Sequence, residues 1–229
     1  MHPAVLLDER FSALSWVSLL EGEEDGTTSE SKDGESLKPL IVEHFEGAME
    51  RVRQHALSVR IFSAVFKWVP PDYYERPLHA RATLLSCKES QMCKSMVMEN
   101  TAIAADCSAE EAKLRYVVVV VQYAAKFNAE KLALAIRSLP SEARKPKKAF
   151  HFRLAPEAVA IDLAGFKHNA VSPLGLLTSL PVVIAQAISE LSSPFIWMGG
   201  GHVNLKLGCT FGHLARALQP IVADISDPR

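Results

Sequence analysis

Residues 116–123 read YVVVVVQY and contain five valines in a row. β-Branched side chains favour extended backbone, and a strand with one wet face would alternate apolar with polar residues. The unbroken apolar run therefore predicts a strand buried on both faces, in the middle of a sheet that helices cover. No apolar run in the chain is longer, and this one is far shorter than the roughly 20 residues of a membrane-spanning helix.

The remaining elements are predicted from apolar spacing and from capping and stop signals. Apolar residues recur at helical spacing through residues 40–66, until Pro70 and Pro71 end the pattern. Further helices are predicted at residues 77–85, 128–139, 156–164, 186–191 and 211–218. Short strands are predicted at 93–98, near 171, at 181–185 and at 195–198. Because strands and helices do not alternate regularly, the sequence predicts mixed α/β structure and disfavours a doubly wound sheet.

Charge is divided unevenly along the chain. The whole chain carries −1, but residues 1–36 contain nine acidic and two basic residues, so the remainder carries +6. Residues 21–36, EGEEDGTTSESKDGES, have no apolar periodicity and predict a disordered linker. We therefore expect an acidic leader and linker over residues 1–38, a helical extension over 39–77 and the main domain over 78–229. A basic body suits a phosphate-bearing partner, although a solvated surface would look the same.

Common catalytic motifs are missing from the sequence. It has no GxxxxGK[ST] loop, no GxGxxG after a strand, no GxSxG and no HExxH. No two of the four cysteines have CxxC spacing, so a structural zinc site is disfavoured and the cysteines are interpreted as buried residues or free thiols. With neither a signal peptide nor a spanning segment, we expect a cytoplasmic protein without a metal or cofactor.

Three local segments are candidate sites. The run MGGGHVNLK at residues 198–206 offers backbone that can approach an anion closely, or else a tight hairpin turn. The segment GFKHNAVSPLG at residues 165–175 is a proline-stiffened loop with polar side chains, suited to substrate contacts or to a plain connection. In MCKSMVMENT at residues 92–101, Lys94 either points into a site or extends to solvent.

These segments occur in an order that resembles the YbaK family, also called the prolyl-tRNA-synthetase-associated or INS editing domain. The resemblance rests on KSMVMEN (94–100), RLAPEAVAIDLAGFKHNAVSPLGLL (153–177) and FIWMGGGHVNLKLG (195–208), and it covers about residues 78–225. It implies a mixed α/β fold around a strongly curved sheet. It also implies hydrolysis of the ester joining a wrong, small amino acid such as Ala or Cys to tRNA, chiefly proline tRNA.

The resemblance also implies roles for residues. The working lysine would be Lys94, which would orient the terminal end of the substrate. A positioned water or the substrate's own ribose hydroxyl would do the rest, with neither a metal nor a covalent nucleophile. The loop and the glycine run supply the expected substrate contacts, which are His168, Asn169, Ser172, Pro173, Gly199, Gly200, Gly201 and Asn204. The family loop commonly has glycine where this chain has Asn169, a residue that tolerates positive φ but whose side chain would alter the pocket.

Residues 138–153, SLPSEARKPKKAFHFR, form the most basic segment of the chain. Here we expect tRNA phosphates to bind Arg144, Lys145, Lys147 and Lys148. The expected partners are tRNA and an aminoacyl-tRNA synthetase or synthetase complex, with no DNA and no membrane. Two alternatives remain open: a non-catalytic tRNA-binding or scaffold subunit of a synthetase assembly, and a nucleotide-binding protein that uses MGGGH, which the absence of a phosphate-loop lysine disfavours.

Overall fold

The computed structural model describes residues 47–104 and 106–229. The predicted leader and linker, and the start of the first predicted helix, lie outside the described residues. The helices are α1 (Gly47–Ser58), α2 (Leu78–Leu84), α3 (Ala109–Ala112), α4 (Ala129–Arg137), α5 (Glu157–Ala164), α6 (Gln186–Ser189) and α7 (Phe211–Leu218). Three short 3-10 helices join them, which are η3 (Pro71–Glu75), η4 (Glu89–Gln91) and η5 (Lys147–Ala149). None of the helices in this part of the chain is long and apolar enough to cross a membrane.

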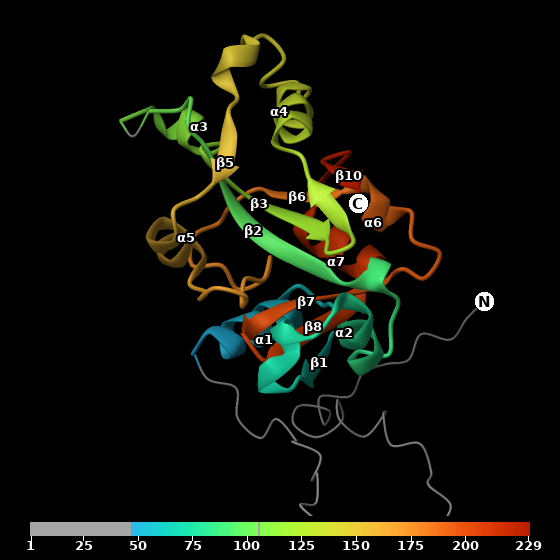
Figure 1. The fold of residues 1–229 in the computed structure, drawn as a ribbon. Coiled ribbons are helices and arrows are strands. Elements are labelled where there is room, and N and C mark those ends of the chain that lie inside the picture. The colour runs from blue at the N-terminus through green and yellow to red at the C-terminus, as the bar shows by residue number, and fades with distance from the viewer. Residues whose placement is uncertain (1–46, 105) are drawn as a thin grey trace, which may run out of the picture. The chain divides into compact units, whose positions relative to one another are not determined.

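The larger sheet has the strand order β5-β2-β3-β6-β9 (Figure 1). Its strands are β2 (Cys93–Asn100), β3 (Tyr116–Gln122), β5 (Phe152–Leu154), β6 (Val182–Ala185) and β9 (Ile221–Ala223). The central strand β3 runs antiparallel to β2 and parallel to β6. All five of its valines are 0% exposed, so the predicted central strand, buried on both faces, is confirmed.

A smaller antiparallel sheet has the order β1-β8-β7, with β1 (Val65–Trp68), β7 (Phe195–His202) and β8 (Leu205–Thr210). A parallel bridge between Met92 and Trp197 connects it to the start of β2. The helix predicted over residues 40–66 was too long, because Arg60 adopts a left-handed φ of 57° after α1 ends. Residues 65–68 instead pair with β8, and this part of the expected extension thereby contributes an edge strand.

Among the other local predictions, two helix ends are confirmed and one strand is wrong. Asn128 caps α4 by accepting hydrogen bonds from the backbone N–H groups of Glu130 and Lys131, and Gly165 ends α5 with a φ of 74°, both as predicted. Residue 171 lies in a loop, so the strand predicted there was wrong. The segment at residues 198–206 was predicted to be either anion-binding backbone or a tight hairpin turn, and it contains the turn between β7 and β8. The glycines themselves lie within β7, where the register with β8 shifts between Gly199 and His202. The chain reverses only afterwards, at residues 203–204.

Candidate functional site

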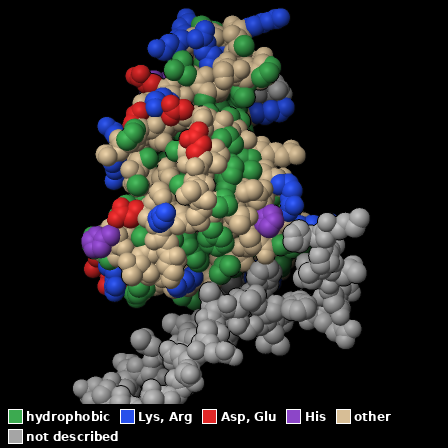
Figure 2. All heavy atoms as spheres, turned by 90° about the vertical axis from the view of Figure 1, so that its right-hand side faces the viewer, with side chains coloured by type: hydrophobic (Ala, Val, Ile, Leu, Met, Phe, Trp, Pro, Cys, Tyr) green, Lys and Arg blue, Asp and Glu red, His purple; other side chains and the backbone are tan. Residues whose placement is uncertain are grey.

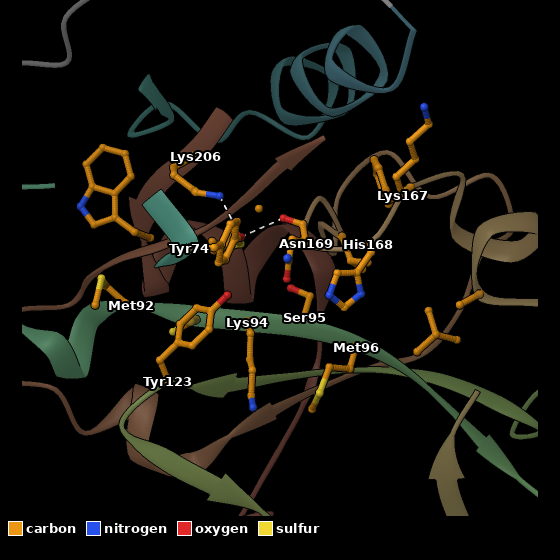
Figure 3. A pocket seen from close by; sticks show the side chains of 18 of the residues that line it. Tyr74, Met92, Lys94, Ser95, Met96, Tyr123, Lys167, His168, Asn169 and Lys206 are labelled. Atoms are coloured by element: carbon orange, nitrogen blue, oxygen red, sulfur yellow. Dashed lines mark hydrogen bonds between the residues drawn. The ribbon is translucent and has the colours of Figure 1, made fainter. Parts of the chain in front are cut away.

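A cavity of about 520 Å³ lies along the free edge of β2. Strand β5 pairs with β2 at residues 98–100, and in the described part of the chain no strand pairs with residues 93–97 on that side. The loop at residues 166–171, strand β7, helix α5 and the 3-10 helix η3 complete the walls (Figure 3). Apolar and aromatic side chains form most of the lining, among them Tyr73, Tyr74, Tyr123 and Trp197, so a ligand here would be largely shielded from water.

One end of the cavity is built around Lys206 of β8, which is only 3% exposed. Its Nζ donates hydrogen bonds to the Tyr74 hydroxyl at 2.9 Å and to the Val203 carbonyl at 2.8 Å. It also lies 4.9 Å and 4.5 Å from the ring centroids of Tyr73 and Tyr74. The Tyr74 hydroxyl donates in turn to the Asn169 carbonyl at 2.9 Å, so one chain of hydrogen bonds joins β8, η3 and the loop (Figure 3).

Burial and a nearby positive charge set the ionisation of Lys206 and of the two tyrosines beside it. Burial lowers the pKa of Lys206 to about 7, and the nearby guanidinium of Arg81 contributes in the same direction. Arg81 is fixed by a 2.7 Å hydrogen bond to the Tyr74 carbonyl and lies 5.4 Å from the centroid of the Tyr74 ring. Burial raises the pKa of the Tyr73 and Tyr74 hydroxyls, so both phenols stay neutral at ordinary pH.

Lys94 reaches the cavity from a different side of β2. Consecutive strand residues point to opposite faces, and Figure 3 shows Lys94 and Met96 extending away from the side on which Ser95 faces the loop. The Lys94 side chain is half-buried, and its Nζ lies 6.0 Å from the centroid of the Tyr123 ring. Burial lowers the pKa of Lys94, and the positive charge of Arg229 adds to that effect.

The loop between α5 and residue 175 supplies the opposite wall. Asn169 has a φ of 62°, so it occupies the left-handed conformation that asparagine tolerates better than most residues. Asn169 and His168 both line the cavity. Across from them, the hydroxyl oxygen of Ser95 is buried and has no hydrogen-bond partner within residues 47–104 and 106–229, which is uncommon for a buried polar atom.

Not all the residues singled out in the sequence lie at this cavity. Its lining includes Lys94, His168, Asn169 and Gly199, but it does not include Ser172, Pro173, Gly200, Gly201 or Asn204. Ser172 is fully buried and accepts a hydrogen bond from the Leu174 N–H within the loop. Asn204 lies in the turn after β7, where its carbonyl accepts from Val69 at 2.8 Å. The proposed substrate roles of the residues outside the lining therefore have no cavity contact to support them.

The glycine run serves close packing of the backbone. A Cβ atom on Gly199 would overlap the carbonyl of Val171, so this glycine lets the loop lie directly on β7. Gly201 has a φ of 93°, and a Cβ there would come within 2.7 Å of the Ala48 carbonyl in α1. Two glycines thus admit a loop on one side and a helix on the other.

Sequence reasoning missed several residues of the cavity lining, which are Tyr73, Tyr74, Ser95, Tyr123 and Lys206, and it missed Arg81, which donates to the Tyr74 carbonyl. One signal was available: Lys206 stands between two leucines in LKLG, inside an apolar strand pattern. Nothing in the spacing connects residues 73–74 with residue 206. Their meeting depends on the pairing of β1 with β8, which carries η3 alongside.

The basic segment lies elsewhere, at the end of the molecule that carries α4 and η5. Figure 2 shows Lys and Arg side chains gathered there, and Arg144, Lys147 and Lys148 are exposed. Lys145 differs from them because it forms a 2.9 Å ion pair with the buried carboxylate of Glu142. Beside this segment, a groove of about 830 Å³ runs between α4 and β5, lined by side chains that include Arg137, Lys147, Lys148 and His151.

No cluster of His, Cys, Asp and Glu able to hold a metal ion occurs within residues 47–104 and 106–229. The four cysteines are free thiols, as interpreted from the sequence.

Comparison with known proteins identifies the fold. No family model matches the chain, and no curated protein matches it. A solved structure of a protein proposed to be a trans-editing enzyme for prolyl tRNA synthetase superposes with a TM-score of 0.62 at 17% identity, covering 80% of this chain and 99% of that one. A scaffold from the computational grafting of epitope backbones gives a TM-score of 0.61 at 16% identity, covering 81% of this chain and 100% of that one. A hypothetical protein gives 0.58 at 20% identity, over 77% and 99% of the two chains.

Identities this low establish a shared fold and nothing finer. The predicted class, mixed α/β with helices around the sheets, is confirmed, and it is the fold of a protein proposed to act in editing.

Proposed function

We propose that this protein hydrolyses the ester bond of mischarged aminoacyl-tRNA. The observation that carries the proposal is that Lys94, the loop residues His168 and Asn169, and Gly199 line one apolar cavity. The likeness in fold to a protein proposed to be a trans-editing enzyme for prolyl tRNA synthetase supports the same conclusion. We propose a small amino acid such as Ala or Cys on proline tRNA as the substrate, and the cytoplasm as the place of action.

The protein needs to lower the reaction barrier only modestly, because an aminoacyl ester is already activated. A water molecule, held directly or through the neighbouring ribose hydroxyl, adds its oxygen to the acyl carbon. The ester C–O bond then breaks, and the ribose oxygen leaves with a proton that the water gave up. Positioning the ester and stabilising its oxyanion can supply the rate enhancement without a nucleophilic side chain. We assign Lys94 to hold the terminal nucleotide, since its half-buried ammonium lies at the free edge of β2.

We propose further that the basic segment binds tRNA phosphates. Arg144, Lys147 and Lys148 are exposed, whereas Lys145 already has a carboxylate partner in Glu142. Replacing all four with Ala should weaken tRNA binding and flatten its salt dependence by roughly 0.7–0.9 per lost phosphate contact. Because Lys145 is paired, we expect the loss to correspond to three contacts. An unchanged salt slope would place the tRNA elsewhere.

The decisive test is deacylation of a panel of charged tRNAs. We expect the protein to release Ala or Cys from proline tRNA and to spare correctly charged prolyl-tRNA, because a steric pocket admits smaller side chains. Failure to deacylate any member of the panel would exclude the proposal. If the tRNAs still bound, the protein would instead be a non-catalytic tRNA-binding subunit.

A further inference from the structure

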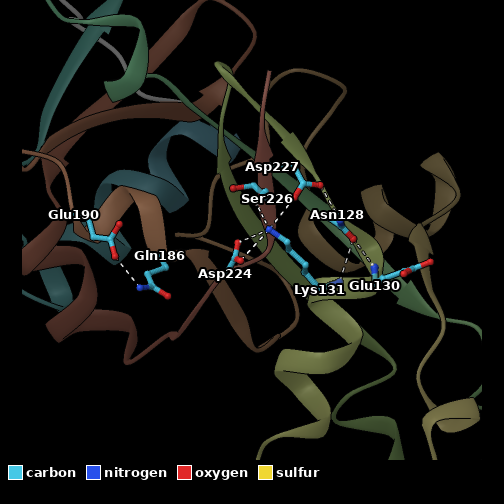
Figure 4. A network of polar contacts seen from close by, with 8 residues as sticks. All are labelled: Asn128, Glu130, Lys131, Gln186, Glu190, Asp224, Ser226 and Asp227. Carbon is cyan, nitrogen blue, oxygen red and sulfur yellow. Dashed lines mark hydrogen bonds and ion pairs between the residues drawn. The ribbon is translucent and has the colours of Figure 1, made fainter.

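Lys206 is a buried amine with no counter-ion among the described residues. The contrast with Lys131 is direct: Lys131 lies between the carboxylates of Asp224 and Asp227, at 2.9 and 2.8 Å, and these ion pairs raise its pKa (Figure 4). Lys206 is 3% exposed, and no ion pair joins it to an Asp or Glu of the described residues. Burying an ammonium without a partner is costly, so its retention here needs an explanation.

One of the three N–H groups of the Lys206 ammonium has no acceptor among the described residues. An ammonium has three N–H groups, and those of Lys206 meet two neutral acceptors, the Tyr74 hydroxyl and the Val203 carbonyl. The Tyr74 hydroxyl uses its own proton on the Asn169 carbonyl, so toward Lys206 it can only accept. The faces of Tyr73 and Tyr74 compensate the charge only in part.

A second unsatisfied donor faces the same space. The Ser95 hydroxyl is buried, and no described residue forms a hydrogen bond with it. It lies on the side of β2 that faces Asn169 and Tyr74 (Figure 3). The charged lining of the cavity comprises Lys94, Lys167 and Lys206 against a single carboxylate, that of Glu157 in the first turn of α5. Both the free donors and the net charge therefore favour a negatively charged ligand group.

We propose that the inner end of the cavity, formed by Lys206, Tyr74 and Ser95, binds an oxyanion of the ligand. Lys206 gives its third N–H and Ser95 its hydroxyl, while Tyr74 holds the amine in place. The inference deepens the proposed function, because an aminoacyl-nucleotide could bring such a group either as an acidic acyl side chain or as a phosphate. It also holds for a cavity ligand that is never hydrolysed, and the two ideas can therefore fail separately.

Titration of the amine in the wild-type protein tests the proposal directly. The ε-carbon signal of Lys206, in protein labelled with ¹³C-lysine, would be followed against pH with matched probe pairs. Adenosine 5′-monophosphate against adenosine reports a phosphate, and aspartate against asparagine reports a carboxylate. We expect one charged probe to raise the pKa of Lys206 by about one unit, a tenfold change, while its neutral counterpart does not. If neither charged probe moves the titration, the proposal is wrong.

The pH dependence of probe binding gives a second reading. An oxyanion needs the ammonium form, so affinity should fall as pH rises through the titration of Lys206. The other titratable or charged groups around the amine are Tyr73 and Tyr74 of η3, Arg81 of α2, Tyr123 after β3 and Lys67 of β1. Burial raises the pKa of all three tyrosines, so none of them loses its proton near neutral pH.

Substitution separates a specific site from general positive charge. Lys206→Met removes the amine at nearly constant length, and it should abolish the discrimination between the charged and neutral probes. Lys67→Met is the matched control, because Lys67 lies opposite Lys206 in the strand register but does not line the cavity. Equal loss of discrimination in both variants would contradict the assignment. A folded wild-type protein that binds the oxyanion yet deacylates no tRNA would uphold this inference and exclude the proposed function.

Discussion

Lys94 and Lys206, which both line the cavity, present the same functional group in different surroundings. Lys94 extends from a free strand edge, half-buried, with the Tyr123 ring beside it. Lys206 is enclosed, held by two hydrogen bonds and packed over two tyrosine rings. A long, partly solvated side chain suits the capture of a terminal group that arrives from solution, whereas a fixed amine suits the selection of one atom. Burial and fixed hydrogen bonds, more than residue type, separate the two roles.

The largest effect is expected at Lys94, the more exposed of the two lysines. Lys94→Ala should lower deacylation by about 10²–10³, or about 2–4 kcal/mol, because a contact made to the transition state would be lost. The measurement is kcat/KM on a mischarged tRNA, alongside thermal unfolding to confirm that the fold survives. A folded variant with wild-type turnover would show that Lys94 is not the working lysine. It would also remove the proposed difference in role between Lys94 and Lys206.

A smaller effect is expected where the loop meets β7. Gly199→Ala would push the new methyl group into the Val171 carbonyl, so the loop must move or the fold must loosen. We expect a loss of about 1–3 kcal/mol in the free energy of unfolding, as for other overpacked sites. Displacing the loop should also disturb the hydrogen bonds around Lys206, because the Asn169 carbonyl accepts the hydrogen bond that holds Tyr74.

Gly212→Ala provides the matched control for that substitution. Nothing lies within 4 Å of a Cβ atom there, and the residue is in α7. Alanine should be neutral or stabilise the fold by up to about 1 kcal/mol. Equal stability of the two variants in denaturant unfolding would contradict the close contact between loop and strand.

The last effect is a pH dependence of the free energy of unfolding that belongs to Lys206. The pKa of Lys206 is about 7 in the fold, against 10.5 for an unperturbed lysine side chain. Between these values the unfolded chain binds more protons, so the free energy of unfolding rises with pH, by at most about 1.4 kcal/mol per unit. Below about pH 7 both states are protonated and the contribution to the slope ends. Comparing denaturant unfolding of wild type and Lys206→Met from pH 6 to 10 isolates this contribution, and parallel curves would show that the amine is not buried as described.

Much of the fold could be predicted from local sequence. The five valines predicted the central strand, Asn128 predicted a helix start and Gly165 predicted a helix end, because each acts through neighbours within a few residues. Residues 65 and 66 were assigned to a helix because their apolar spacing fits either structure. Only pairing with β8, about 140 residues away in the chain, makes them a strand.

The candidate site divides along the same line. The sequence by itself determined that Lys94 lies on a strand and that a stiff polar loop follows α5, since motif order and turn residues are local information. Only the tertiary structure decided that Lys206, Tyr74 and Ser95 meet, because three segments far apart in the chain converge there through sheet pairing and a glycine-permitted backbone contact. The ionisation of Lys206 was likewise determined by the tertiary structure. A lysine is charged by its own chemistry, and burial beside Arg81, with no carboxylate among the described residues to pair with it, brings its pKa near neutrality.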